Sequence, residues 1–472
     1  MVAQAKSPGG AGPLSPLGVL AFACAYMPYA ALNLSVAVQL PRFFATQLGL
    51  GLVAAAAFFI VRLIDIPVDP ALGLLMDRTR TGLGRYRPWM ILSAPILMLA
   101  IYMLYQAPAG VSEGYLIVWL LVIYLGMSIL LVAGNAWAST LAPNYQARSR
   151  IFGAMLAMGV FGTMCCLFIP SIAEKTHRLE IEGMRWVGWF LFALAPFSVA
   201  ISLARTPERL VDPHKTAHFR LADYAALLSR GNVLRILAAD FCVTMGPGWM
   251  AALYLYFFHD SRQLSLTASN LLLALYIAAG LAGAPATAWL GNRISKHRAL
   301  IVSTTFYSLI LIIIPLTPKG QWLPSVLPMF LLGALATGFV VMVRAITADV
   351  ADELRLEGGR DLTALLYAVT SATTKAATAL SISVSFWLLS VQGYSVAPNA
   401  VNAAAQIHGL EITYIIGPIV FVMLGGAAFF GFKLSAEKHA EIRRQLEARD
   451  IEAAALQATT GAPADLPGQP AS

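Results

Sequence analysis

Long apolar runs recur from one end of this chain to the other, and they constrain its fold more than any other feature. A run of about 20 apolar residues is long enough to cross the hydrocarbon core of a bilayer as an α-helix. Charged residues make up 12% of the 472 positions, whereas soluble domains contain roughly 25%. A β-barrel would instead show short segments of alternating polarity. The sequence therefore predicts an all-α polytopic membrane protein.

Twelve runs have this length, and the loops between them predict their orientation. The runs lie near residues 16–40, 48–76, 87–106, 114–140, 151–174, 185–204, 232–258, 267–290, 299–317, 323–348, 363–392 and 410–432. Arginine and lysine gather in alternate loops, starting with the loop at 78–87. Because such loops stay on the cytoplasmic side, both termini are expected in the cytoplasm. The first run is long enough to span, so we interpret it as a retained helix rather than a signal peptide.

A polar segment at residues 205–231 separates six runs from six. The short basic segments MDRTRTGLGRYRP and GNRISKHR follow the second and the eighth run, which is a weak sign of two related halves. Paired halves are typical of secondary transporters, with a substrate site between them. We predict six-helix bundles at 1–204 and 232–433, joined by a cytoplasmic linker at 205–231. A cytoplasmic tail at 434–472 is expected to be helical and then disordered.

The stretch VRLIDIPVDP, residues 61–70, places three charges inside the second run. On an uninterrupted helix, Arg62, Asp65 and Asp69 share one face. A charge at the bilayer centre costs roughly 2.5–3.5 kcal/mol on insertion scales, so each of these residues needs a partner. Lys375, among the small residues of SATTKAATAL in the eleventh run, completes a formally neutral set. We predict a cation-coupling site; the alternative is a static ion-pair cluster that holds helices together.

Other polar residues within the runs are candidates to line a substrate cavity. The triplet Gly-Pro-Gly at 246–248 is expected to break the seventh run at mid-depth and expose groups to a cavity. Pro67 and Pro70 interrupt backbone hydrogen bonding beside the two aspartates. Arg344 is expected to reach the interface or to pair with Asp349. The candidate substrate-binding residues, chosen for depth and polarity, are Tyr29, Asn33, Asn135, Trp137, Asp240, Trp249, Tyr254, Thr373 and Thr374.

Several other classes of protein are disfavoured. The four cysteines lie within apolar runs and show no metal-binding spacing, so neither a disulfide framework, a metal site nor a cofactor is expected. No HExxH, GxSxG or GxGD motif supports an intramembrane enzyme. The net charge of +8 fits basic cytoplasmic loops better than nucleic-acid binding. A receptor or scaffold fits the number of spans but gives no reason for the buried charges.

The segment RLIDIPVDPALGLLMDRTRTGLGRYRPW, residues 62–89, resembles the signature of the glycoside–pentoside–hexuronide:cation symporters. These are melibiose-permease-like members of the major facilitator superfamily. Their pattern has an arginine and two aspartates on the second span, then DP, a glycine, an acidic-basic turn and G-R-x-R-P-W. Trp137, TADVADE at 347–353 and Lys375 match as well, and the resemblance extends to about residue 432. It implies two six-helix halves.

The resemblance also implies roles for individual residues. By position, Asp65 and Asp69 would bind the coupling cation, with Lys375 close by. The residues that would form the cytoplasmic gate are Asp77, Arg78, Arg148, Arg150, Asp349 and Asp352.

Departures from the family pattern bear on the ion and the substrate. Val68 and Leu130 stand where the melibiose-type sodium site has an asparagine and a threonine. Sodium needs several oxygen ligands, whereas a proton needs one carboxylate, so H⁺ is favoured over Na⁺. Ala133 and Met158 stand where a carboxylate and an arginine bind galactosides, and the first span contains no acid. A simple galactoside is therefore not the expected substrate.

We predict symport of a cation with a sugar, glycoside or related small polar solute by alternating access. The alternative is a cation-coupled carrier or flippase for a lysolipid or other amphiphile. The protein is expected as a monomer in the bacterial inner membrane, where its partners are the small-molecule substrate and membrane lipid.

Overall fold

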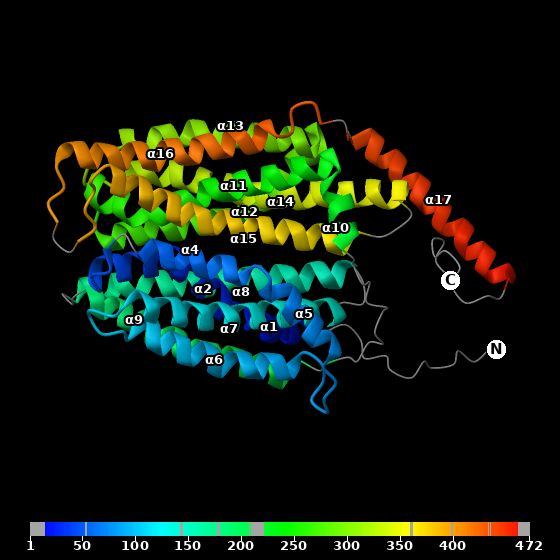
Figure 1. Ribbon diagram of the computed structural model, residues 1–472, viewed down its shortest axis with the longest axis horizontal. Helices are drawn as coiled ribbons and strands as arrows, with labels where there is room; N and C mark the ends of the chain where they lie inside the picture. The colour runs from blue at the N-terminus through cyan, green and yellow to red at the C-terminus, as the bar shows by residue number, and fades with distance from the viewer. Residues whose placement is uncertain are drawn as a thin grey trace. The chain divides into compact units, whose positions relative to one another are not determined.

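The computed structural model describes residues 15–51, 54–141, 145–176, 180–206, 208, 221–358, 362–397, 400–432, 434 and 436–460. The described chain is built from helices (Figure 1), and its β-pairing is one isolated bridge between Thr81 and Gly84. Contacts divide the chain into two units. The first unit comprises Met1–Val36 and Pro67–Lys215, and the second comprises Ala37–Ile66 and Thr216–Ser472. The division at 204 and 232 that the sequence suggests stays a prediction.

Within the described residues, the first unit is a bundle of four long helices together with three short ones. Its helices are α1 (Pro16–Ala23), α2 (Tyr26–Leu34), α5 (Val68–Arg78), α6 (Arg87–Tyr105), α7 (Glu113–Leu141), α8 (Tyr145–Lys175) and α9 (Glu180–Arg205). Helix α6 packs against both α7 and α9, while α2 packs against α8.

The second unit holds the remaining helices. Its α-helices are α3 (Leu40–Arg42), α4 (Ala54–Asp65), α10 (Leu221–Leu228), α11 (Gly231–Tyr256), α12 (Leu266–Ile294), α13 (Lys296–Ile313), α14 (Val326–Gly358), α15 (Thr363–Val391), α16 (Ala404–Ala427) and α17 (Ala436–Thr460). Short π-helical and 3₁₀ segments are η1 (Ser35–Gln39), η2 (Phe43–Gln47), η4 (Phe257–Ser261), η5 (Ile314–Leu316) and η6 (Leu323–Ser325), with η1 crossing the boundary between the units. Helix α4 packs on α15, and α11 packs on both α15 and α16.

Eleven helical segments of the described chain are long and apolar enough to cross a membrane. The expected second span is missing from these because it is divided at Ile66 and Pro67 into α4 and α5. Proline has no N–H to continue the helical ladder, and each half alone is too short to cross a bilayer. The all-α polytopic fold is confirmed, and the divided helix accounts for the difference from twelve.

The expected break at 246–248 is wrong, because α11 runs through it with Pro247 inside the helix. The two glycines serve close packing instead. A Cβ on Gly246 would overlap Val422 of α16, and one on Gly248 would lie 2.6 Å from Ser381 Oγ of α15. Small residues allow membrane helices to approach closely.

Two short segments in the second unit begin with the same two residues and have a similar local structure. FFATQLGL at 43–50 and FFHDSRQL at 257–264 each begin with a π-helical segment. In both, the sixth residue donates its backbone N–H to the first carbonyl at 3.1 Å. The seventh residue has positive φ in both, 79° at Gly49 and 56° at Gln263. This likeness supports an internal duplication more strongly than the basic loops do.

The carboxylate of Glu208 caps the start of α6 within the first unit. It accepts hydrogen bonds from the backbone N–H groups of Arg85, Tyr86 and Arg87 at 2.6, 2.8 and 3.3 Å. The first N–H groups of a helix have no intrahelical acceptor, and a negative charge is favourable there. Gly84, with φ 116°, leaves the space that this carboxylate occupies.

Replacing Glu208 with Ala is expected to destabilise the first unit by about 1–2 kcal/mol, the usual cost of losing a helix cap. Glu208→Gln keeps an acceptor oxygen but loses the charge, so its loss should be smaller. Thermal unfolding of the purified protein in detergent measures both. Equal melting temperatures for Glu208→Ala and the unchanged protein would show that the cap contributes nothing.

Candidate functional site

Asp65 pairs with two cations inside the second unit. Its side-chain Oδ2 lies 2.8 Å from Lys375 Nζ and 3.2 Å from Arg62 Nη1, and the residue is 3% exposed. Lys375 Nζ also donates to the backbone carbonyl of Asp65 at 3.0 Å. Residues 310 positions apart in sequence therefore share one buried cluster. One carboxylate faces two positive groups, so the cluster changes its net charge when the carboxylate is neutralised.

The end of α4 explains why Lys375 fits at this place. The last carbonyls of a helix have no intrahelical donor, and the C-terminal end of a helix attracts positive charge. Because α4 ends at Asp65, the lysine reaches a carboxylate and the C-terminal end of a helix together. The turn at Ile66 and Pro67 interrupts the helix on which Arg62, Asp65 and Asp69 were expected to share a face.

Asp69 lies in the first turn of α5 and so belongs to the first unit. Its participation in the cluster around Asp65 stays a prediction.

Asp240 and Thr374 form a second polar contact in the second unit. Thr374 Oγ1 lies 2.7 Å from Asp240 Oδ2, and Asp240 is 8% exposed. Thr374 precedes Lys375 on α15, so consecutive residues of one helix contact aspartates of α11 and α4. The neighbouring Thr373 bonds within its own helix, to Val369 O at 3.0 Å.

Three aromatic candidates for substrate binding are packed inside their units. Trp137 is fully buried against Phe22 of the first unit, with ring centroids 5.3 Å apart. In the second unit, Tyr254 is fully buried and donates its hydroxyl to Ser269 O at 2.8 Å. Trp249 lies against α16 at Gly417. The indole N–H groups of both tryptophans find no acceptor among the described residues, so either can still serve a ligand or water.

The remaining substrate candidates are less buried. Tyr29 lies beside Tyr26, with ring centroids 5.2 Å apart. Both tyrosines line a small hollow of the first unit that is otherwise apolar and includes Leu130 and Met155. Asn33 and Asn135 have exposed side chains. All nine substrate assignments stay predictions.

The gate residues of the first unit are only partly described. The side chains of Asp77 and Arg148 lie outside the described part of the structure, and those of Arg78 and Arg150 are exposed.

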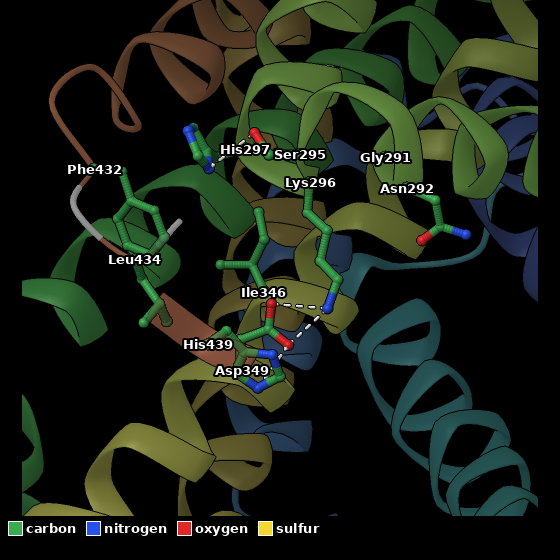
Figure 2. A pocket seen from close by; sticks show the side chains of 10 residues that line it. All are labelled: Gly291, Asn292, Ser295, Lys296, His297, Ile346, Asp349, Phe432, Leu434 and His439. Carbon is green, nitrogen blue, oxygen red and sulfur yellow. Dashed lines mark hydrogen bonds and ion pairs between the residues drawn. The ribbon is translucent and has the colours of Figure 1, made fainter. Parts of the chain in front are cut away.

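The gate carboxylates of the second unit contact the tail helix α17. Lys296 Nζ donates to both oxygens of Asp349, at 2.6 and 2.7 Å. His439 of α17 lies 3.3 Å from Asp349 and 3.1 Å from Asp352. Figure 2 shows Lys296 and His439 meeting at Asp349, beside a pocket of about 140 Å³. The sequence assigned no chemistry to the tail. Asp349 pairs with Lys296, while Arg344, expected to reach the interface or to pair with Asp349, is exposed.

Two buried residues also fix α17 on the unit. Ile442 and Leu446 are 6% and 5% exposed, and they lie on the same side of the helix as His439.

His439→Ala is expected to speed amide hydrogen exchange over residues 436–446 roughly tenfold, since a hydrogen bond to a charged group contributes about 1.5–3 kcal/mol. Gln445→Ala is the control, because among the described residues its amide bonds Glu441 of the same helix. Equal exchange in both variants would contradict the docking role of His439.

The sequence also did not single out a buried arginine that directly precedes the segment at 43–50. Arg42, 7% exposed, donates to Leu255 O at 3.4 Å and lies 5.5 Å from the centroid of the Tyr256 ring. The Tyr256 hydroxyl is 3.2 Å from Thr46 Oγ1. These contacts bring the two repeated segments together within the second unit.

Comparisons with known proteins identify the family to which this chain belongs. A model of the family described as "MFS/sugar transport protein" matches residues 21–436. The isoprimeverose transporter of Lactiplantibacillus pentosus is 25% identical over 86% of this chain and 86% of its own length. The glucuronide carrier protein homolog of Escherichia coli is 22% identical, covering 88% of this chain and 91% of its own length.

A eukaryotic relative and a solved structure complete the comparison. The sodium-dependent lysophosphatidylcholine symporter 1-B of Danio rerio is 22% identical over 83% of this chain and 82% of its own length. A crystal structure of the nucleoside transporter NupG has a TM-score of 0.64 at 13% identity, covering 89% of this chain and all of NupG. That likeness shows the fold. The chain is a multi-pass membrane transporter that belongs to the MFS/sugar transport protein family, among the glycoside–pentoside–hexuronide:cation symporters of the major facilitator superfamily.

Proposed function

We propose that this protein couples the entry of a cation to the transport of a sugar or glycoside by alternating access. The observation that carries the proposal is the buried cluster of Arg62, Asp65 and Lys375. Such charges are costly within a membrane, where ionisable residues mark ion and proton pathways. The relatives named for isoprimeverose and glucuronide transport support a glycoside as the cargo.

Coupling follows from the charge balance at Asp65. A cation that neutralises the carboxylate weakens the attraction between Asp65 and Lys375, which favours a shift of α15 against α4. A rearranged α15 changes the affinity for substrate, and substrate changes the affinity for the cation by the same factor. Asp69 is proposed as the second carboxylate of this site.

We propose H⁺ as the coupling ion. Lys375 and Arg62 already form ion pairs with the Asp65 carboxylate. A metal cation bound there would be repelled by these two positive groups at close range. Leu130 stands where the melibiose-type sodium site has a threonine, and it is buried among apolar side chains in the first unit. A proton needs a single carboxylate oxygen and displaces no further ligand.

The proposal also includes the oligomeric state of the transporter, its membrane and its orientation there. It works as a monomer in the bacterial inner membrane with both termini in the cytoplasm. Its two six-helix halves rock about the substrate, and the gate carboxylates Asp349 and Asp352 act at the cytoplasmic side.

Uptake into proteoliposomes tests the proposal. Purified protein is reconstituted, an inward gradient of H⁺ or Na⁺ is imposed, and radiolabelled pentosides, hexuronides and disaccharides are offered in turn. Accumulation above equilibrium with the proton gradient, abolished by a protonophore, is expected for at least one glycoside. Accumulation driven by sodium alone would overturn the choice of ion, and accumulation of none under either gradient would overturn the function.

A lysolipid is the second candidate cargo, and two observations favour it. One relative is named as a lysophosphatidylcholine symporter, and the hollow beside Tyr26 and Tyr29 is lined mostly by apolar side chains. Lysophosphatidylcholine added to the same assay decides between the cargoes. Gradient-driven uptake of the lipid, without uptake of any sugar, would favour this candidate.

A further inference from the structure

Asp240 is a second buried carboxylate, and its surroundings differ from those of Asp65. Asp65 lies against an ammonium and a guanidinium, both within 3.2 Å. Within the described residues, the side-chain hydrogen-bond donor that reaches Asp240 is the hydroxyl of Thr374, at 2.7 Å. A buried ionised carboxylate normally requires several donors or a paired charge. The surroundings of Asp240 therefore contain few groups that would stabilise the ionised carboxylate but not the protonated acid.

Thr374 can satisfy Asp240 with or without a bound proton. A threonine hydroxyl carries one hydrogen and two lone pairs. Its oxygen lies 2.7 Å from Asp240 Oδ2 and 3.1 Å from the carbonyl of Thr370. When Asp240 is ionised, the hydroxyl donates to the carboxylate. When Asp240 is protonated, the acid donates to Thr374 Oγ1, and the hydroxyl turns to the Thr370 carbonyl. No polar atom of the pair loses its partner in either state.

The charged groups around Asp240 leave both states accessible. On α14, the guanidinium of Arg344 attracts the carboxylate electrostatically, but its side chain is exposed. On α15, Lys375 is directed to Asp65, and the Tyr367 hydroxyl lies 3.3 Å from the Arg344 carbonyl.

The other helices that pack on α11 place their titratable groups elsewhere. On α16, Glu411 pairs with Arg262, Tyr414 stacks on Phe257, and His408 lies 3.6 Å from Glu411. Helix α10 contacts α11 and carries Asp223 and Tyr224. These two precede the first residue of α11, whereas Asp240 lies more than two turns into it.

We propose that Asp240 is a proton-binding site in its own right, with Thr374 as the partner that changes hydrogen-bonding role. The proton comes from hydronium: an O–H bond breaks there, forms at Asp240 Oδ2, and leaves water. Because Thr374 and Lys375 are consecutive on α15, protonation of Asp240 and of Asp65 acts on the same turn of helix. The link to transport rests on the proposed function, but proton binding at Asp240 can be measured without any transport.

Infrared difference spectroscopy on the full-length protein in liposomes tests the site. Spectra recorded across a pH titration should contain C=O stretches of protonated carboxylic acids, and one titrating band that is present in Asp65→Asn should be absent in Asp240→Asn. Thr374→Val keeps the size of the side chain but removes the hydroxyl, so it should shift the frequency of the band. Thr374→Ser should restore the frequency. Thr378→Val is the matched control, because within the described residues its hydroxyl bonds the Thr374 carbonyl, at 2.9 Å, and the band should be unchanged.

Each outcome bears on the proposal separately from transport. A spectrum in which the titrating band survives in Asp240→Asn, or in which Thr374→Val and Thr378→Val behave alike, overturns the proton site. Loss of the band in Asp240→Asn together with uptake driven only by sodium supports the site and overturns proton symport. If Asp240→Asn does not fold, the shift in Thr374→Val and its reversal in Thr374→Ser decide the matter alone.

Discussion

Asp65→Asn is expected to abolish gradient-driven accumulation of substrate in proteoliposomes while exchange of substrate across the membrane continues. Asparagine has nearly the shape of aspartate but neither binds a proton at neutral pH nor carries the charge that holds Lys375. The carrier therefore loses the ion that drives it without losing its route across the membrane. Counterflow of labelled substrate, measured beside uptake under an imposed proton gradient, separates the two activities.

The same variant should also be less stable. Removing one partner of a buried ion pair leaves the other charge uncompensated, at a cost of about 3–5 kcal/mol. Here the remaining charges are the ammonium of Lys375 and the guanidinium of Arg62. The double variant Asp65→Asn with Lys375→Ala should recover much of this stability, but not accumulation.

Glu113→Gln is the matched control for Asp65→Asn, because Glu113 has an exposed side chain in the first turn of α7. It should accumulate substrate at the unchanged rate. Accumulation by Asp65→Asn at the same level would remove Asp65 from the coupling mechanism. Asp69→Asn, assayed in parallel, tests the proposed second carboxylate.

Gly333→Ala is expected to destabilise the second unit by about 1–3 kcal/mol or more, the range measured for overpacked cores. Helices α12 and α14 approach each other closely along a row of glycines. A Cβ on Gly333 would overlap the backbone carbonyl of Tyr276, and one on Gly283 would overlap the backbone of Ala334. Backbone atoms cannot turn aside as a side chain can, so the helices must separate.

Thermal unfolding in detergent measures this effect, and Gly153→Ala is its control. Gly153 lies within α8, and its added Cβ would meet nothing within 4 Å. Alanine is favoured over glycine inside a helix by about 1 kcal/mol, so the control should keep or raise its melting temperature. Equal melting temperatures for the two variants would show that the α12–α14 crossing tolerates a methyl group.

Local features of the sequence predicted the helices well, and distant contacts explain the errors. Run length and polarity identified the membrane helices because both are properties of a single segment. The triplet at 246–248 was misread because its glycines pack against α15 and α16, which periodicity along α11 does not show. Glu208 was missed because the N–H groups that it caps lie more than 120 residues earlier in the chain. The tail was assigned no chemistry because its partners lie on α14, more than 80 residues earlier in the chain.

From the sequence alone, it follows that this chain crosses a membrane many times and that charges at residues 62, 65, 69 and 375 need partners, since a bilayer offers ionisable groups neither water nor counter-ions. Only the tertiary structure decided which partners meet: Lys375 with Asp65, Thr374 with Asp240, and His439 with Asp349 and Asp352. The physical reason is that hydrogen bonds and ion pairs act over a few ångströms, and the packing of helices brings residues from distant parts of the chain within that range.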